Sequence, residues 1–207
     1  MNSRIQRERN FHNDRFRNNP TRSEKLRGMT NSITLEALRI AYSKIERYSP
    51  DACVLDYGCA QGESSFIVNR YGVKSVHAID ISDVAIAQAR EELTRHRAEN
   101  IKFDVMNAEE MDFPSATFDL VYGFGILHHL DLDKSLGEIA RVLKPTGRAV
   151  FLEPLGHNPA INLFRNLTPS IRTPDEHPLR MKDLRHINMY FSDAEVTHLN
   201  LATLATV

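Results

Sequence analysis

The stretch that decides the fold is "VLDYGCAQG", which runs from Val54 to Gly62. Its apolar start is typical of a buried strand, and small residues then recur at every second position. Glycine in such a turn permits a backbone conformation that other residues avoid, and it lets the chain approach another group closely. The stretch therefore predicts a strand, a tight turn and a helix that begins at Glu63.

Strand-like and helix-like segments alternate through the middle of the chain. The apolar runs of strand length are "ACVLDYG", "SVHAIDIS", "IKFDVMNA", "FDLVYGFG" and "LKPTGRAVFLEP". Helical spacing of apolar residues occupies residues 32–48, 63–71, 82–98 and 131–143. This alternation predicts an α/β fold, in which a Rossmann-like, doubly wound and mostly parallel sheet carries helices on both faces.

Composition divides the chain into three regions. Residues 1–30 form a basic N-terminal arm, whose first 27 residues hold eight Lys or Arg against three acids. Such an arm is either a solvated extension or a lid over an anionic or amphipathic substrate, and the sequence leaves both open. Residues 31–153 are the expected core. Residues 154–207 combine a proline-rich insertion on the substrate side with a terminal helix and strand.

The last region departs from the regular alternation. Five prolines lie between residues 154 and 179, which predicts an insertion that rests over the site. Beyond it, "MKDLRHINMYF" predicts a helix and "AEVTHLNLATLATV" predicts a buried, paired strand, so the sheet is expected to be truncated or covered by a partner at its C-terminal end. One or two basic residues of this region are expected to contact an anionic group of the substrate; the candidates are His157, Arg165, Arg172, His177 and Arg180.

Charge and composition exclude several classes of protein. The formal net charge of −1 gives no general field that would attract nucleic acid. No run of about 18 apolar residues occurs, so no segment is expected to span a membrane. The polar N-terminus lacks a signal peptide, and Cys53 and Cys59 alone make no disulfide framework, so a cytoplasmic location is expected. The expected partner is a small-molecule substrate, and a homo-oligomer is compatible with the sequence.

The glycine turn differs from a dinucleotide-binding fingerprint. Gly58, Ala60 and Gly62 recur in steps of two, and Glu63 takes the place where a third glycine would stand. A large acid at that place argues against pyrophosphate binding. Asp80 lies eighteen positions beyond Gly62, at the end of the second expected strand, where an acid can accept hydrogen bonds from ribose hydroxyls. The turn and this acid together predict a nucleoside site.

The same segments resemble a known family. "VLDYGCAQG", "VHAIDIS", "NAEEMDFPSATFDLVYGFGILHHL" and "LKPTGRAVFLEP" stand in the order typical of the class I S-adenosylmethionine-dependent methyltransferases, in the branch that methylates small molecules. The resemblance covers Cys53 to Glu153. It implies S-adenosyl-L-methionine as the cofactor, and methyl transfer to an oxygen, nitrogen or carbon acceptor by in-line displacement. Such a reaction requires no metal and no covalent intermediate.

The resemblance also implies which residues bind the cofactor. The loop beside the methionine moiety would comprise Asp56, Tyr57, Gly58, Ala60 and Gly62. Asp80 would hold the ribose hydroxyls, with Ile81 against the adenine. Asn107 and Ala108 stand where the family often has an Asp-Ala pair, and the amide oxygen can still accept a hydrogen bond from the adenine amine.

Two details complete the implied cofactor site. Gly123 and Phe124, at the end of the fourth expected strand, would line the methionine end. Ala60 stands where the family usually has glycine. It is expected to alter the loop geometry slightly without abolishing binding, unless the position requires a positive φ.

Three further residues are candidates for catalysis. His128 and His129 follow the fourth expected strand, and they serve either as structural hydrogen-bonding groups or as a general base for a protonated acceptor. Because adjacent histidines are expected to point in different directions, no shared metal ion is predicted. Glu153 closes the fifth expected strand, where it either faces the same crevice or caps the loop below it.

Two other functions stay open. The first is a non-catalytic domain that keeps the cofactor-binding fold for binding or assembly. The second, an NAD-dependent oxidoreductase, is disfavoured by Glu63 and by the spacing of the glycine turn.

Overall fold

The computed structural model of this chain describes residues 3–18, 32–154, 173, 175–176, 178–180 and 182–197. Most of the expected proline-rich insertion lies outside the described residues, and so do four of its candidate basic residues, His157, Arg165, Arg172 and His177. Within the described ranges, no helix is both long enough and apolar enough to cross a membrane.

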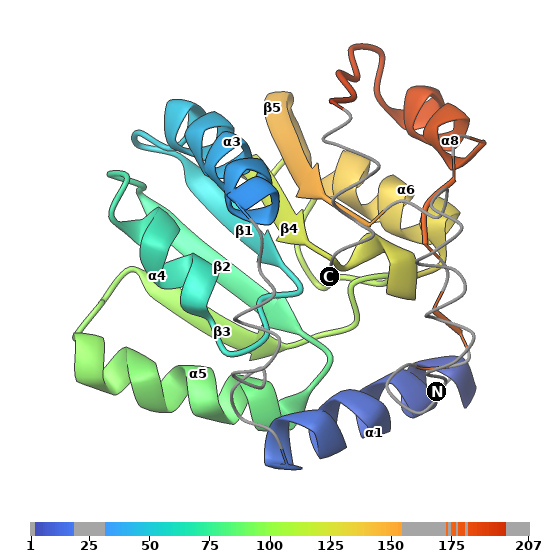
Figure 1. The fold of residues 1–207 in the computed structure, drawn as a ribbon. Helices are drawn as coiled ribbons and strands as arrows, with labels where there is room; N and C mark the ends of the chain where they lie inside the picture. The colour runs from blue at the N-terminus through green and yellow to red at the C-terminus, as the bar shows by residue number, and fades with distance from the viewer. Residues whose placement is uncertain are drawn as a thin grey trace.

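Five strands form one parallel sheet at the centre of the molecule (Figure 1). They are β1 (Cys53–Tyr57), β2 (Ser75–Asp80), β3 (Ile101–Val105), β4 (Phe118–Phe124) and β5 (Leu143–Leu152). Their order is β3-β2-β1-β4-β5, and every neighbouring pair runs parallel. The chain winds outward from β1 in both directions, so the predicted doubly wound α/β fold is confirmed. The strand order reverses beside the carboxyl end of β1, where such sheets bind ligands.

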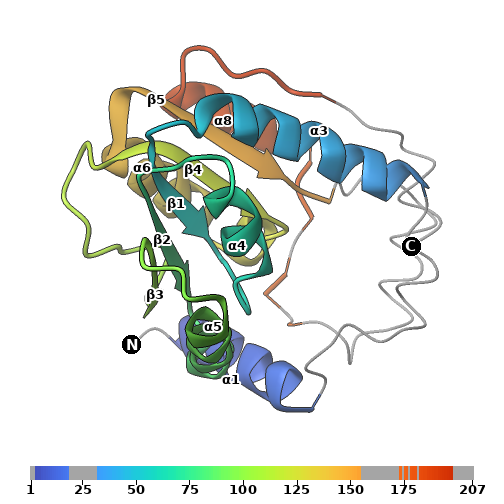
Figure 2. The same cartoon turned by 90° about the vertical axis from the view of Figure 1, so that its left-hand side faces the viewer.

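Helices cover both faces of the sheet because neighbouring residues of β1 point to opposite sides. The four helices that follow this pattern are α3 (Ser32–Tyr48), α4 (Glu63–Asn69), α5 (Asp83–His96) and α6 (Leu132–Val142). Val54 lies in one core cluster with Ile45 of α3 and Val68 of α4. Leu55, the next residue, lies in the opposite cluster with Ile139 of α6. Figure 2 shows the two layers from the side.

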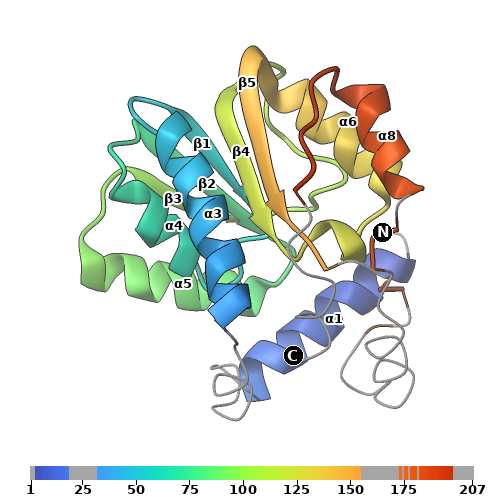
Figure 3. The same cartoon turned by 45° about the horizontal axis from the view of Figure 1, so that its top comes forward.

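The N-terminal arm contains a helix, α1 (Ser3–Asn18), which lies across the carboxyl ends of the strands and beside α5 (Figures 1 and 3). Its polar side chains attach it to the core. Asn13 is buried, its amide nitrogen donates to Asp83 Oδ1 at 2.6 Å, and its oxygen accepts from Ser82 Oγ at 2.6 Å. The described part of the arm is therefore packed against the core, in the place that a lid would occupy.

The described part of the C-terminal region contains one helix, α8 (Asp183–Tyr190), close to the predicted position. It packs on α6. The strand predicted for residues 194–207 is wrong over residues 194–197, which have no regular structure and are exposed. Glu195 instead pairs with Lys44 of α3 at 2.8 Å, which holds this segment on the outside of a helix and away from the sheet. The rest of the predicted strand lies outside the described residues.

Candidate functional site

The loop after β1 turns through three residues with positive φ. Gly58, Ala60 and Gly62 have φ angles of 83°, 49° and 82°. A Cβ on Gly62 would lie 2.6 Å from the ring of Phe103, so the missing side chain allows the loop to pack against β3. A Cβ on Gly58 would lie 2.7 Å from the side chain of Ile126. Both glycines are therefore required by close packing as well as by their backbone conformation.

Ala60 occupies a left-handed conformation that glycine would adopt without strain. Its φ of 49° meets the condition under which alanine is unfavourable, and such a conformation costs an L-residue about 1–2 kcal/mol. The backbone N–H of Ala60 donates to Asp80 Oδ2 at 2.9 Å, which holds the turn in place. Every second residue of the loop, from Gly58 to Gly62, thus has a positive φ, and at Ala60 this conformation is strained.

Replacing Ala60 by glycine is expected to raise the free energy of unfolding by up to about 1 kcal/mol, because relief of strain exceeds the added chain entropy of the unfolded state. Urea unfolding at neutral pH measures the change. The matched control is Ala87→Gly, at an exposed helical position of α5, which is expected to lower stability by about 1 kcal/mol. A loss of stability in the Ala60→Gly variant as large as in the control would show that the alanine is unstrained.

Asp56 lies beneath the loop with only 2% of its surface exposed. Its Oδ2 accepts hydrogen bonds from Ser64 Oγ, Ser65 Oγ and Tyr122 OH, at 2.7, 2.6 and 2.7 Å. Burial raises the pKa of Asp56 to about 6, although the three hydroxyls act in the opposite direction. The carboxyl group therefore ties the first turn of α4 to β4 and supports the loop from within the core.

Four other predicted cofactor residues are closely packed beside the loop. Tyr57 is fully buried and its hydroxyl donates to the carbonyl oxygen of Ala108 at 2.7 Å. A Cβ on Gly123 would lie 2.7 Å from the carbonyl oxygen of Tyr57, so β1 and β4 approach too closely there for any side chain. The ring of Phe124 lies 5.2 Å from the ring of Tyr42 in α3, in an edge-on contact. Strands β1 and β4 are therefore packed closely together next to the loop.

Asp80 joins the glycine loop to the start of α5. Its Oδ2 accepts the N–H of Ala60 and its Oδ1 accepts the N–H of Ser82, both at 2.9 Å. Ser82 is the N-cap of α5, and its side chain accepts from Ala85 N–H. Each carboxylate oxygen of Asp80 keeps a second lone pair, so the carboxylate can still accept hydrogen bonds from a ligand.

A pocket of about 380 Å³ opens at Ile81, the residue that follows Asp80, and it is within the size range of small-molecule sites. It is lined by Ile5, Arg9, Ile81, Asn107, Glu109, Glu110 and Lys134. Two residues that were expected to meet an adenine ring, Ile81 and Asn107, therefore line the same pocket. Asn107 Oδ1 accepts the N–H of Glu109 at 3.1 Å, which fixes the direction of its amide group. The residues present fit an adenosyl group between the end of β2 and the end of β3.

Sequence reasoning missed the residues of α1 that complete this pocket. Arg9 Nε donates to the carbonyl oxygen of Ile81 at 3.1 Å. Arg4 donates to the carbonyl oxygen of His129 at 3.1 Å and forms an ion pair with Glu109. The basic charge of the arm was the one available signal, and it did not distinguish these two arginines from the others.

His128 and Glu153 form a hydrogen-bonded pair. His128 Nδ1 lies 2.8 Å from Glu153 Oε2, while Glu153 Oε1 accepts the N–H groups of Ile126 and Leu127 at 2.8 and 2.9 Å. The two histidines lie in a single 3₁₀ turn, η1 (Leu127–His129). Glu153 thus orients His128 and caps the turn that carries it, which is the second of the two roles predicted for this residue. With a proton on Nδ1, His128 would present Nε2 as a base.

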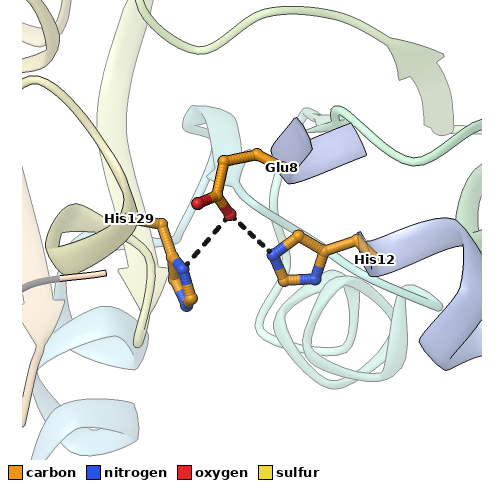
Figure 4. Close-up of side chains that lie close together, drawn as sticks. All are labelled: Glu8, His12 and His129. Carbon is orange, nitrogen blue, oxygen red and sulfur yellow. Dashed lines mark ion pairs between the residues drawn. The ribbon is translucent and has the colours of Figure 1, made fainter. Parts of the chain in front are cut away.

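His129 faces α1. Its Nδ1 lies 3.5 Å from Glu8 Oε2, and His12 Nε2 lies at the same distance from that oxygen (Figure 4). Burial raises the pKa of Glu8, but its interactions with the two imidazoles and with the hydroxyl of Thr173 outweigh burial and hold the pKa well below its ordinary value. The tight 3₁₀ turn brings the rings of His128 and His129 to 4.2 Å with a tilt of 39°, yet they contact different partners, Glu153 and Glu8.

Comparison with known proteins bears on this site. Residues 55–151 match a family model described as a methyltransferase domain. The chain is 37% identical over 105 residues to the aklanonic acid methyltransferase DauC of Streptomyces sp. (strain C5), a match that covers 49% of this chain and 48% of DauC. It is 34% identical over 128 residues to the ubiquinone/menaquinone biosynthesis C-methyltransferase UbiE of Geobacter sulfurreducens, covering 60% of this chain and 49% of UbiE.

A solved structure supports the fold. The YcgJ protein of Bacillus subtilis superposes with a TM-score of 0.62 at 23% identity, over 72% of this chain and 65% of that chain. At this identity the likeness concerns the fold alone. The matches cover 48% of DauC and 49% of UbiE, so this chain spans about half the length of each relative.

Proposed function

We propose that the whole protein transfers a methyl group from S-adenosyl-L-methionine to a small-molecule acceptor, since residues 55–151 match the methyltransferase-domain family model and similar proteins include named methyltransferases. The observation that carries this proposal is that Ile81 and Asn107, which follow β2 and β3, line one pocket, while Asp80, next to Ile81 in the chain, is hydrogen-bonded to the glycine loop. A ribose has hydroxyls for that carboxylate, and an adenine has a flat apolar face and an amine for the pocket.

The chain's own residues have separate tasks in this proposal. S-adenosyl-L-methionine, when bound, supplies the electrophilic methyl group. Asp80 binds the ribose hydroxyls, and the strained loop from Gly58 to Gly62 holds its backbone beside the methionine moiety. Helix α1, through Ile5 and Arg9, covers the pocket and excludes water from it. Alignment and exclusion of water are the main requirements of an in-line displacement.

His128 is the residue best placed to accept a proton from the acceptor. Glu153 lies within hydrogen-bond distance of Nδ1, which orients the ring, as a carboxylate does for a catalytic histidine. This role applies to a hydroxyl, phenol or carbon acid, and an amine that arrives unprotonated needs no base. We therefore propose His128 as a conditional base and Glu153 as its positioning residue.

The names of the similar proteins guide the choice of acceptor. DauC is named for aklanonic acid, and UbiE for ubiquinone and menaquinone biosynthesis and for methylation at carbon. We propose an acceptor of comparable kind, an anionic or amphipathic small molecule, with oxygen, nitrogen and carbon as the candidate atoms. Arg180, whose side chain is exposed in the described C-terminal part, stays a candidate contact for an anionic group. A cytoplasmic location and a homo-oligomer stay predictions.

The proposal is tested by turnover. The full chain is incubated with S-adenosyl-L-methionine and, separately, with phenolic acids, quinol precursors and amines, and the release of S-adenosyl-L-homocysteine is followed. We expect release that depends on one acceptor class and saturates with its concentration. Reactions that lack the acceptor are the matched control. Cofactor binding without turnover on any acceptor class would favour the alternative, a non-catalytic binding or assembly domain.

A further inference from the structure

Two elements that are far apart in the sequence bring three metal-ligand side chains together. Glu8 and His12 are one helical turn apart on α1, so both side chains project from the same face. His129 comes from η1, at the carboxyl end of the sheet. Figure 4 shows the carboxylate of Glu8 between the two imidazole rings. One nitrogen of each ring and one oxygen of Glu8 all lie within 4.8 Å of one another.

The separations suit metal ligation better than hydrogen bonding. Glu8 Oε2 lies 3.5 Å from His12 Nε2 and 3.5 Å from His129 Nδ1. Hydrogen bonds between such atoms usually measure about 2.7–3.2 Å. Two ligand atoms that each bind a tetrahedral zinc ion at about 2.0–2.1 Å are about 3.3 Å apart. Both contacts therefore lie within a few tenths of an ångström of the separation that a shared cation would impose.

The same atoms are buried without a hydrogen-bond partner. Glu8 is 6% exposed. Within the described part of the chain, Glu8 Oε2 and His129 Nδ1 are two of the five buried side-chain polar atoms that lack a hydrogen bond. A buried polar atom without a partner costs about 1–3 kcal/mol, and native proteins contain few of them. Glu8 Oε2 and His129 Nδ1 lie 3.5 Å apart, and neither has a hydrogen-bond partner among the residues that the structure describes. A bound ion between them would give both atoms an interaction partner.

A neighbouring contact orients the carboxylate. Glu8 Oε1 accepts a hydrogen bond from the hydroxyl of Thr173, which is itself buried. This contact occupies one carboxylate oxygen and leaves Oε2 facing the histidines. Hydrogen bonds of this kind behind the ligands are a regular feature of protein metal sites.

We propose that Glu8, His12 and His129 bind a divalent transition-metal ion of the zinc class, which fastens helix α1 over the carboxyl end of the sheet. Two imidazoles and one carboxylate form a ligand set that zinc accepts, with a fourth position for water or another ligand. The proposal is independent of methyl transfer, because it uses neither the glycine loop nor Asp80. It assigns His129 to the metal and leaves His128, with its partner Glu153, for proton transfer.

The test is metal binding by the full chain. The protein is stripped with a chelator, dialysed and titrated with Zn²⁺ alone by calorimetry. We expect one strong site per chain. His12→Ala is expected to lower the affinity for Zn²⁺ by about 100-fold or more, because one of three protein ligands is lost. The matched control is His96→Ala, at an exposed position of α5 that lies outside the group, and it is expected to bind as the wild type does.

Two further measurements keep the proposal falsifiable if a variant loses stability. Co²⁺ in place of Zn²⁺ is expected to give the visible absorption of a four-coordinate site in the wild type and in His96→Ala, but not in Glu8→Gln. Saturating Zn²⁺ is expected to raise the melting temperature of the wild type and not that of His12→Ala, because a ligand stabilises only the state that binds it. Absence of a strong site in the wild type, or equal affinity in His12→Ala, would overturn the proposal and leave an ion-paired His–Glu–His group.

Discussion

Raising the pH from 4 to 7.5 is expected to lower the free energy of unfolding of the wild-type chain by about 2.5 kcal/mol relative to that of the Asp56→Asn variant. Burial raises the pKa of Asp56 from 3.8 to about 6 in the folded state. Between these two values the folded state holds a proton that the unfolded state has released, so each rise in pH favours unfolding. Asparagine has no such titration, and its amide oxygen can accept the hydroxyl groups that meet Asp56.

Urea unfolding of both proteins at several pH values between 4 and 7.5 measures this difference. A control that stays flat over this range is available in Asp119→Asn. The pKa of Asp119 is lowered because its ion pair with Lys144 and a hydrogen bond from Cys53 N–H outweigh its partial burial, so the wild type gains its stability over this variant as the pH rises to about 3.8 and keeps it nearly constant from pH 4 to 7.5. Parallel curves for the wild type and Asp56→Asn would show that burial does not raise the pKa of Asp56 in the folded state.

Asp80→Ala is expected to weaken binding of S-adenosyl-L-homocysteine by about 1–3 kcal/mol, which is about 5- to 150-fold in affinity. Two losses contribute to this change. The ribose hydroxyls lose a charged acceptor, and the N–H groups of Ala60 and Ser82 lose the carboxylate that fixes the loop and the start of α5. Calorimetric titration of the folded variant measures the affinity.

Two control variants separate the contributions to this effect. Asp80→Asn keeps one oxygen acceptor without the charge, and its affinity is expected to lie between those of the wild type and Asp80→Ala. Asp83→Ala removes the nearby acid in the first turn of α5, which contacts Asn13 of α1, and is expected to bind the cofactor more tightly than Asp80→Ala. Unchanged affinity in Asp80→Ala would contradict the assignment of Asp80 to the ribose.

Most of the core was predictable because each strand carries its own local signal. Val54 and Leu55 are both fully buried, and such apolar runs mark central strands that are covered on both faces. The glycine turn and Ser82 likewise mark the start of α4 and α5 by local chemistry. The prediction of a C-terminal strand was wrong over residues 194–197 because its apolar residues resembled those of a buried strand. In the structure, Glu195 at the start of this segment is held on the surface by its ion pair with Lys44.

The placement of α1 was not predictable, since it depends on polar contacts with residues far along the chain. Its helix contains few apolar residues, and it is attached through Arg4, Arg9 and Asn13 to carbonyl and side-chain oxygens of the core. The sequence predicted where His128 and Glu153 lie, but it did not predict the contact between them. Both residues were placed at strand ends by the sequence, but their contact follows from the adjacency of β4 and β5 in the sheet.

The most direct test of the central claim, that the glycine loop and the neighbouring pocket bind an adenosyl cofactor, is calorimetric titration of the full chain with S-adenosyl-L-homocysteine. NAD, titrated in parallel, is the matched control because it shares the adenosine but adds a pyrophosphate that Glu63 disfavours. We expect one molecule of S-adenosyl-L-homocysteine to bind per chain, with no measurable binding of NAD. Absence of binding to the folded chain, or binding of NAD in its place, would contradict the claim.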